Sequence, residues 1–132
     1  MSADLAVASA RRQSRASLLG SWLDGGTIAL YTGTRPATPN TALSSQVLLT
    51  TFTLPNPAGS ATDGVWTGTL PNPALILASG TPAWARIKDS AAGVVCDADV
   101  GATGSGAAVE VANTSFVSGA YASIASMTVT EG

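Results

Sequence analysis

The residues after Gly26 form short runs rich in Thr, Val and Leu, and Gly, Pro, Asn and Asp separate these runs. Such runs are typical of antiparallel strands joined by turns. No helical run lies between them, which disfavours an alternating α/β fold. The pattern therefore predicts a mainly β protein, an antiparallel β-sandwich or jelly roll of about eight strands. The predicted strands are residues 27–32, 46–54, 65–69, 74–79, 82–88, 93–97, 107–112 and 121–130.

The N-terminal segment has a different pattern. Residues 3–23 contain no proline, and their only glycine is Gly20. We predict a helix here, which Gly25-Gly26 ends because glycine readily adopts the left-handed conformation that closes a helix. Its second half presents an apolar face. That face consists of Leu18, Leu19, Trp22 and Leu23. We therefore expect two parts: an N-terminal helix or arm over residues 1–24 and a β-sandwich domain over residues 25–132.

Charge is scarce in this chain. Its 132 residues include six basic and eight acidic side chains and no histidine, for a net charge of −2. The absence of histidine excludes Ser-His-Asp triads, Cys-His pairs and His-ligated zinc. The chain has too few Lys and Arg residues to bind a phosphate backbone through several contacts, so nucleic acid is not an expected partner. We expect a protein that is not an enzyme and has no cofactor.

Two arrangements of acidic residues are weak signals, one for cation binding and one for glycoside hydrolysis. Asp97 and Asp99 lie two residues apart, beside the glycine-rich residues 101–106, as in part of a calcium loop. The other ligands of such a loop are missing, so we predict a polar turn followed by a flexible loop, and cation binding stays open. Two of the acidic residues could also form a pair for glycoside hydrolysis, but sequence spacing does not show which of them share a cleft.

Cys96 is the only cysteine, so an intrachain disulfide is excluded and an intracellular assembly site is favoured. We predict that it is a small buried apolar side chain and not a nucleophile, because no histidine is present to activate it. The N-terminus lacks the pattern of a secretory signal, and no apolar run approaches the ~20 residues that span a bilayer. We expect a soluble protein that is not exported and does not bind membranes.

The sequence LPNPA occurs twice, at residues 54–58 and 70–74. Each proline fixes its own φ and keeps the residue before it out of the helical region, so both copies are stiff and extended. We expect two strand ends that share one turn design.

Half of the positive charge lies within five positions, at Arg11, Arg12 and Arg15. On a helix, positions 11 and 15 share a face and position 12 lies beside them. A solvated helix face and a contact with acidic residues of a partner subunit both explain this cluster. Most of the three Trp residues are expected in the core, but an exposed Trp can anchor an interface. The candidate interface residues are Arg11, Arg12, Arg15 and Trp22.

Several segments follow one another in an order that resembles a known group of proteins. They are GGTIALYTGTRPA at 25–37, LLTTFTL at 48–54, SGTPAWAR at 79–86, ADVGATGSG at 98–106, and Thr114-Ser115, Ser118-Gly119 and SIASMTVT (123–130) near the end. Over about residues 20 to 131, the chain is similar to small structural proteins encoded among the virion genes of tailed bacteriophages. The LPNPA segments and Pro82 depart from the group's pattern, which leaves the contact surfaces open.

The resemblance implies a structural protein of the virion, assembled in the host cytoplasm. Among the roles that such proteins take, we favour a capsid decoration (cement) protein that binds and stabilises the head lattice. Its partners would be the major capsid protein and other copies of itself, as a dimer or trimer. A place in the tail or baseplate is an alternative within the same class. A carbohydrate-binding or adhesion module is an alternative from another class, since an exposed aromatic side chain can stack on a sugar.

Overall fold

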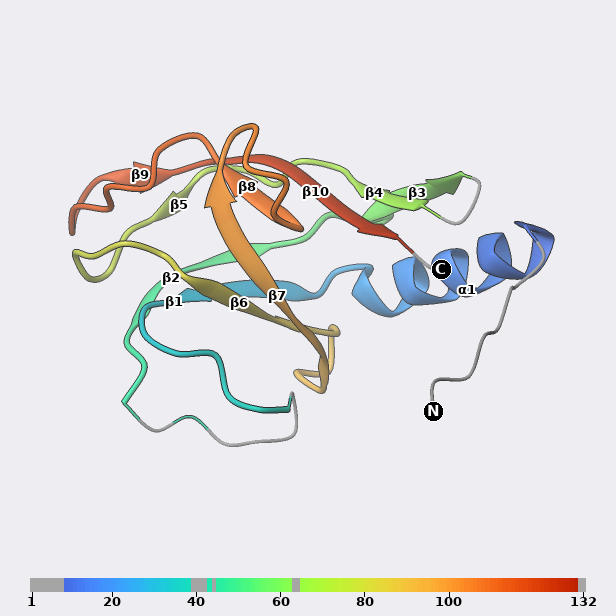
Figure 1. Cartoon of the computed structure of the whole chain (residues 1–132), viewed down its shortest axis with the longest axis horizontal. Coiled ribbons are helices and arrows are strands. Elements are labelled where there is room, and N and C mark those ends of the chain that lie inside the picture. The colour runs from blue at the N-terminus through green and yellow to red at the C-terminus, as the bar shows by residue number, and fades with distance from the viewer. Residues whose placement is uncertain (1–8, 39–42, 44, 63–64, 131–132) are drawn as a thin grey trace, which may run out of the picture.

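The computed structural model describes residues 9–38, 43, 45–62 and 65–130 of the chain. Within them lie one helix and ten strands, so the predicted mainly β class is confirmed (Figure 1). The elements are α1 (Ser9–Leu23), β1 (Thr27–Tyr31), β2 (Leu48–Thr53), β3 (Gly59–Thr62), β4 (Val65–Gly68), β5 (Ala74–Leu75), β6 (Trp84–Lys88), β7 (Val94–Ala102), β8 (Val109–Val111), β9 (Tyr121–Ala122) and β10 (Ile124–Thr130).

Eight of the strands form one sheet, in the order β2-β1-β6-β7-β8-β10-β4-β3. The sheet curls over itself, so that β2, β1 and β6 form one layer and β8, β10, β4 and β3 lie opposite, with β7 crossing between them (Figure 1). Strands β5 and β9 form a separate two-stranded ribbon. The arrangement is sandwich-like. It departs from the predicted antiparallel pattern at one place, because β7 and β8 pair in parallel.

The strand boundaries differ from the predicted ones where pairing overrides local composition. Strand β3 was not predicted, because its sequence GSAT contains no large strand-forming side chain, yet it pairs with β4 along its whole length. Strand β7 continues to Ala102, into the predicted flexible loop, because its second half pairs with β8. The predicted strand 121–130 is divided into β9 and β10, which belong to different sheets.

Helix α1 packs on the end of the sheet at β3 and β4. It ends as predicted: Gly25 adopts a φ of +70°, and the Gly26 amide donates to the Leu23 carbonyl oxygen at 2.9 Å. Gly20 allows the helix to approach Trp66 of β4, since a Cβ at position 20 would lie 2.6 Å from the indole nitrogen. Residues 3–8 of the predicted helix lie outside the described residues.

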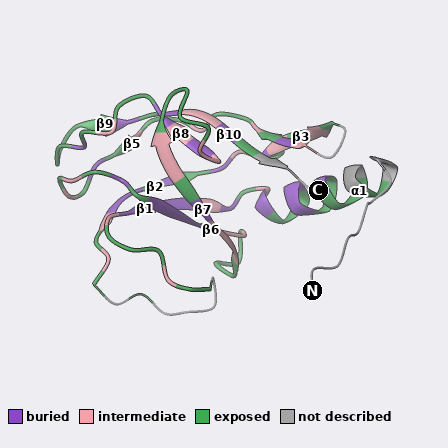
Figure 2. Ribbon diagram, viewed as in Figure 1, coloured by how far each residue is buried: buried purple, intermediate pink, exposed green. Residues whose placement is uncertain are grey.

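The predicted apolar face of the helix is divided in the structure. Leu19 and Leu23 are buried together with Ala16, whereas Leu18 and Trp22 are each 51% exposed. Ala16 and Leu23 belong to the same core as the strands. Figure 2 shows buried segments on α1 as well as on the sheet. The boundary between an arm at 1–24 and a domain at 25–132 stays a prediction, but the second half of the helix shares its core with the sheet.

We predict that Leu23→Ala lowers the free energy of unfolding by about 2–5 kcal/mol, because it removes a fully buried side chain between helix and sheet. Leu18→Ala makes the same chemical change on the exposed side of the helix and should cost no more than about 0.5 kcal/mol. Urea-induced unfolding measures both. Equal effects at the two positions would contradict the packing of α1.

Candidate functional site

The best-defined polar interaction joins β6 to β7. Arg86 and Asp97 are register partners on the two strands. The Arg86 guanidinium donates two hydrogen bonds to the Asp97 carboxylate, Nε to Oδ1 at 2.8 Å and Nη2 to Oδ2 at 3.0 Å. The two side chains are only 6% and 5% exposed. The hydrogen bond to Asp97 raises the pKa of Arg86. Such a bidentate ion pair holds the two strands in one register.

Aromatic rings cover this ion pair on the outer face of the sheet. Tyr31 stacks on Trp84 with ring centroids 4.8 Å apart, and the Arg86 guanidinium carbon lies 5.3 Å from the centre of the Trp84 ring. Burial raises the pKa of Tyr31. Together with Ala29, the two rings form a small cluster separate from the main core. These contacts stabilise the pairing of β6 with its neighbours in the sheet.

Asp97 and Asp99 do not form the predicted polar turn, and that prediction is wrong. Both lie within β7, because residues 94–99 pair with β6, with one irregularity in the register between Val94 and Cys96. Asp97 binds Arg86, and the Asp99 carboxylate accepts a hydrogen bond from the Ala108 amide at 3.0 Å. They border an open cavity of about 400 Å³. Among the described residues, no group of three or more Asp, Glu or Cys side chains is placed to hold a metal ion.

The other described carboxylates also serve the fold. Asp24 accepts a hydrogen bond from the Ala58 amide at 2.7 Å and so ties the end of α1 to the segment before β3. Asp89 closes the turn between β6 and β7 by accepting from the amides of Ala91 and Gly93 at 3.0 and 2.8 Å. These carboxylate oxygens already accept hydrogen bonds within the fold. A structural role is therefore favoured for them over acid–base catalysis.

Glu110 organises the glycine-rich segment. Its carboxylate accepts hydrogen bonds from the amides of Gly104 at 3.2 Å and Gly106 at 2.9 Å, and from the Ser126 hydroxyl at 3.1 Å. The bond from Gly104, followed by those from Gly106 and Ser126, lowers the pKa of Glu110. The segment was predicted to be a flexible loop. The sequence signal for this loop closure is the short distance in sequence from Gly104 and Gly106 to the carboxylate of Glu110.

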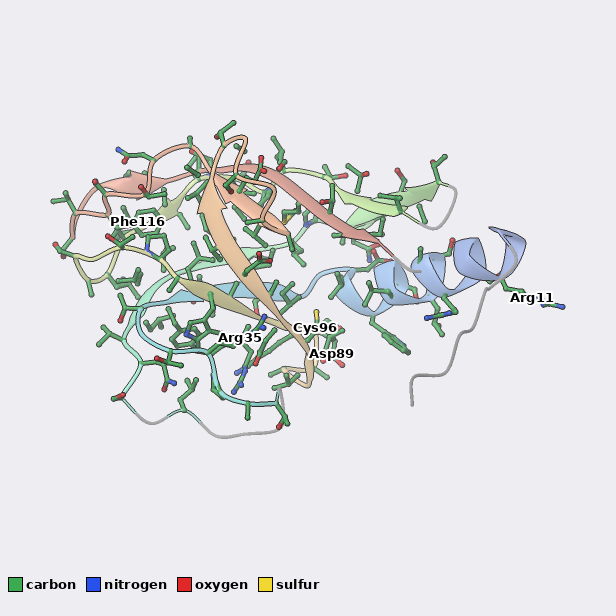
Figure 3. The ribbon with its side chains drawn as sticks, viewed as in Figure 1. Arg11, Arg35, Asp89, Cys96 and Phe116 are labelled. Carbon is green, nitrogen blue, oxygen red and sulfur yellow. The ribbon has the colours of Figure 1, made fainter. Side chains whose placement is uncertain are left out.

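Cys96 faces the main core from β7 and is half-buried (Figure 3). Burial, together with the neighbouring Asp97 charge, raises its pKa to about 11. At neutral pH almost none of it is the reactive thiolate. This agrees with the prediction of a packing residue, although the side chain is less buried than expected.

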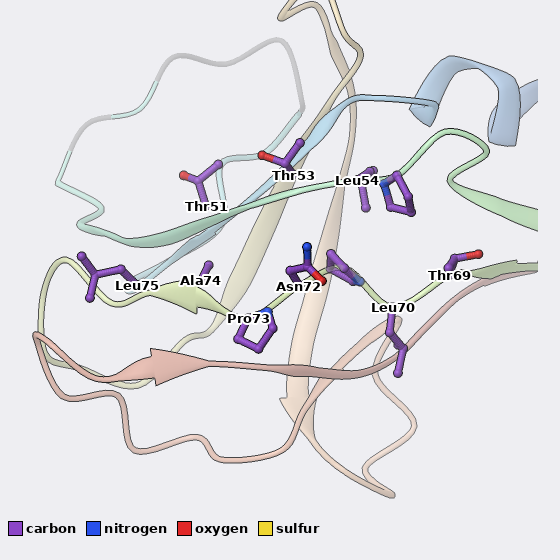
Figure 4. Close-up of a pocket in the computed structure, with 11 residues that line it drawn as sticks. Thr51, Thr53, Leu54, Thr69, Leu70, Asn72, Pro73, Ala74 and Leu75 are labelled. Carbon is purple, nitrogen blue, oxygen red and sulfur yellow. The ribbon is translucent and has the colours of Figure 1, made fainter.

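An open groove of about 610 Å³ lies between β2 and the segment that leads into β5 (Figure 4). Both LPNPA copies contribute to its lining, the first through Leu54 and Pro55 and the second through all five residues, 70–74. Thr51 and Thr53 form the β2 side. The described residues that line this groove include no charged or titratable side chain, so they supply no general acid or general base.

The predicted interface residues lie on α1. Arg11 and Arg15 are exposed, and Trp22 is 51% exposed. With the equally exposed Leu18, they are spaced four, three and four residues apart, so all four lie on one face of the helix. Figure 3 shows Arg11 pointing away from the body of the molecule. The backbone of Arg12 is helical, and its side chain lies outside the described residues. We call the exposed row the α1 face.

Comparison with protein-family models, curated proteins and solved structures finds no match to this chain. In the described part of the chain, no helix has the length and apolar character needed to cross a membrane.

We predict that Cys96 reacts slowly with thiol reagents. A pKa of about 11 leaves on the order of a hundredfold less thiolate at pH 8 than the usual cysteine pKa does. Alkylation at pH 8 should therefore be slower by about that factor in the folded protein than in urea. Equal rates in the two conditions would show that the thiol is open to solvent.

We predict that acid loosens the Gly104–Gly106 turn. Because the pKa of folded Glu110 is lowered, its contribution is present above the unfolded pKa and is lost as the pH falls through the folded pKa. Amide signals of Gly104 and Gly106 in an NMR pH titration should shift with a midpoint below the usual glutamate value of about 4.3. Glu110→Gln should abolish that titration. A midpoint at or above the usual value would contradict this assignment.

Proposed function

We propose that this chain is a non-enzymatic structural protein of a tailed-phage virion, a capsid decoration protein that binds and stabilises the head lattice. The resemblance of residues 20–131 to small virion proteins supports this role. The observation that carries the proposal is the α1 face. On the neighbouring side of α1, the buried side chains of Ala16, Leu19 and Leu23 anchor the helix in the core. The α1 face is thus presented on a fixed support.

The chemistry of the α1 face suits a protein partner. Arg11 and Arg15 supply cationic, multidentate donors, and Leu18 and Trp22 supply apolar area. Arg and Trp are enriched among the residues that dominate binding energy at protein interfaces. The matching surface on the major capsid protein would carry carboxylates beside a pocket for the indole. Arg12 adds to the positive charge of the same segment.

The interior of the molecule supports a binding role over catalysis. The described carboxylates discussed above are bonded to backbone amides or to Arg86. The described residues that line the groove beside β2 are uncharged. An enzyme instead needs titratable groups held free in a cleft, with pKa values matched to proton transfer. Assembly in the host cytoplasm and incorporation into the virion complete the proposal.

Stabilisation of the head would follow from mass action. A protein that binds only the assembled shell stabilises it by about 2.7 kcal/mol per site when its free concentration is a hundred times Kd. Repetition over many lattice sites multiplies this effect. Self-association as a dimer or trimer would further raise the occupancy by linking neighbouring sites.

A carbohydrate-binding module is less well supported. Sugar stacking by such modules would require exposed aromatic rings close together. The exposed aromatic side chains are Trp22, on α1, and Tyr121, on β9. These two elements lie at opposite ends of the molecule (Figure 1). A place in the tail or baseplate uses the same kind of protein contact and is distinguished by where the protein is found on the particle.

We predict that Trp22→Ala weakens binding to the head by at least about 30-fold, as expected for loss of a central interface residue. Arg11→Glu should weaken it as well, and more strongly at low salt. The assay is co-sedimentation with heads of the encoding phage that lack their decoration protein. Arg35→Glu, the same charge change at another exposed position, and Val94→Ala are the controls and should bind as the unmodified chain does.

Melting temperatures of all four variants are measured alongside, so that loss of binding is separated from loss of folding. Unmodified protein that does not bind heads would contradict the proposed role. Undiminished binding by the Trp22 and Arg11 variants would contradict the α1 face as the contact.

A further inference from the structure

A second exposed surface lies at the end of the molecule opposite α1. Leu75, Leu77, Val117 and Tyr121 are 46%, 58%, 59% and 70% exposed. Leu75 and Tyr121 are directly paired across the β5–β9 ribbon, so their side chains lie on the same side of it. Leu77 lies two residues beyond Leu75, past the end of β5, and is exposed as Leu75 is, whereas Ile76 between them is buried. We call these four side chains the ribbon face.

The ribbon itself is firmly held. Ile76 and Ala122, on its inner side, are each 4% exposed and belong to the main core. Beyond the paired residues, the Ile76 amide donates to the Ala120 carbonyl oxygen at 2.8 Å, and the Gly119 amide donates to the Ile76 carbonyl oxygen at 2.9 Å. Phe116, also buried, anchors the segment that carries Val117 (Figure 3). The ribbon face is therefore a fixed apolar surface.

The two segments that form the ribbon and its connections contain no charged residue. Residues 64–85 and 111–130, which include both ribbon strands and their connections, contain no Asp, Glu, Lys or Arg. The ribbon face is bordered by small, exposed polar residues. These are Ser79, Asn113, Ser115, Ser118 and Ser123. Protein interfaces typically have an apolar, uncharged centre that is rich in aromatic residues such as Tyr, and a polar rim. The ribbon face has this composition.

We propose that the ribbon face binds the same face of a second copy of this chain, across a twofold axis. In a twofold contact each patch meets its own copy, so any charge near the axis would face an identical charge. A charge-free centre meets that requirement, whereas a face for a different protein gains specificity from complementary charges. Interfaces of homodimers are also more apolar than those between different proteins, and the ribbon face consists of exposed apolar side chains.

This contact is separate from the proposed head contact. The ribbon face and α1 lie at opposite ends of the molecule (Figure 1), so a twofold dimer leaves both copies of the α1 face accessible. The inference does not depend on the proposed function, because it concerns the free protein in solution. Its failure would leave the α1 contact untouched, and the reverse also holds.

The test is sedimentation velocity of the full chain, without heads, over a wide range of protein concentrations. The unmodified chain should reach a dimer. Leu77→Lys and Tyr121→Lys each place a charge beside its symmetry mate and should raise the dimer Kd by at least about 30-fold. Leu18→Lys and Val94→Lys put the same charge at other exposed apolar positions and should leave the Kd unchanged.

A second measurement keeps the test valid if a variant folds poorly. Tyr121→Cys in a Cys96→Ala background should form a disulfide-linked dimer under mild oxidation, whereas Leu18→Cys in that background should not. A chain that stays monomeric at every concentration overturns the proposal. So does a trimer, or a dimer that Leu77→Lys and Tyr121→Lys leave intact, since the ribbon face would then be open to a different partner such as the capsid protein.

Discussion

The pairing of β6 with β7 through Arg86 and Asp97 is the constraint on which the rest of the fold depends. Strand β7 pairs with β6 over its first residues and with β8 over its last, so it joins the two layers of the curled sheet. A slip of one residue would move every side chain of β7 to the other face and would separate the buried ion pair. Removing one partner of a buried pair costs about 3–5 kcal/mol. The pair therefore fixes the register from which both layers are built.

The sequence contained enough information to predict the class of fold, the single helix with its Gly25-Gly26 end, and most strand positions, because these follow from local composition and spacing. It did not contain a local signal for β3, whose four small residues form a strand only because β4 offers a partner. The placement of Asp97 and Asp99 in a strand, and the parallel pairing of β7, likewise depend on residues far away in sequence. Register and long-range pairing are tertiary properties that turn signals cannot report.

The candidate interface residues were predicted by type but not by geometry. A cluster of Arg and a Trp on the same predicted helix suggested a contact, but only the packing of Ala16, Leu19 and Leu23 shows which side of the helix is left exposed. The ribbon face was not predicted, because Leu75 and Tyr121 are distant in sequence and become neighbours only in the fold. The acidic and basic side chains of this protein differ in where they act. Most described carboxylates hold turns and strands in place, and the surfaces at the two ends carry arginine at one end and no charge at the other.

An electron cryomicroscopy reconstruction of decorated heads tests the central claim most directly, because it locates the chain and its orientation together. We expect density for this fold on the outer surface of the shell, with α1 against the capsid protein and the β5–β9 ribbon turned away from that contact, toward a second copy. Density with the ribbon or a sheet face against the shell and α1 exposed to solvent would contradict it, as would the protein's presence only in the tail.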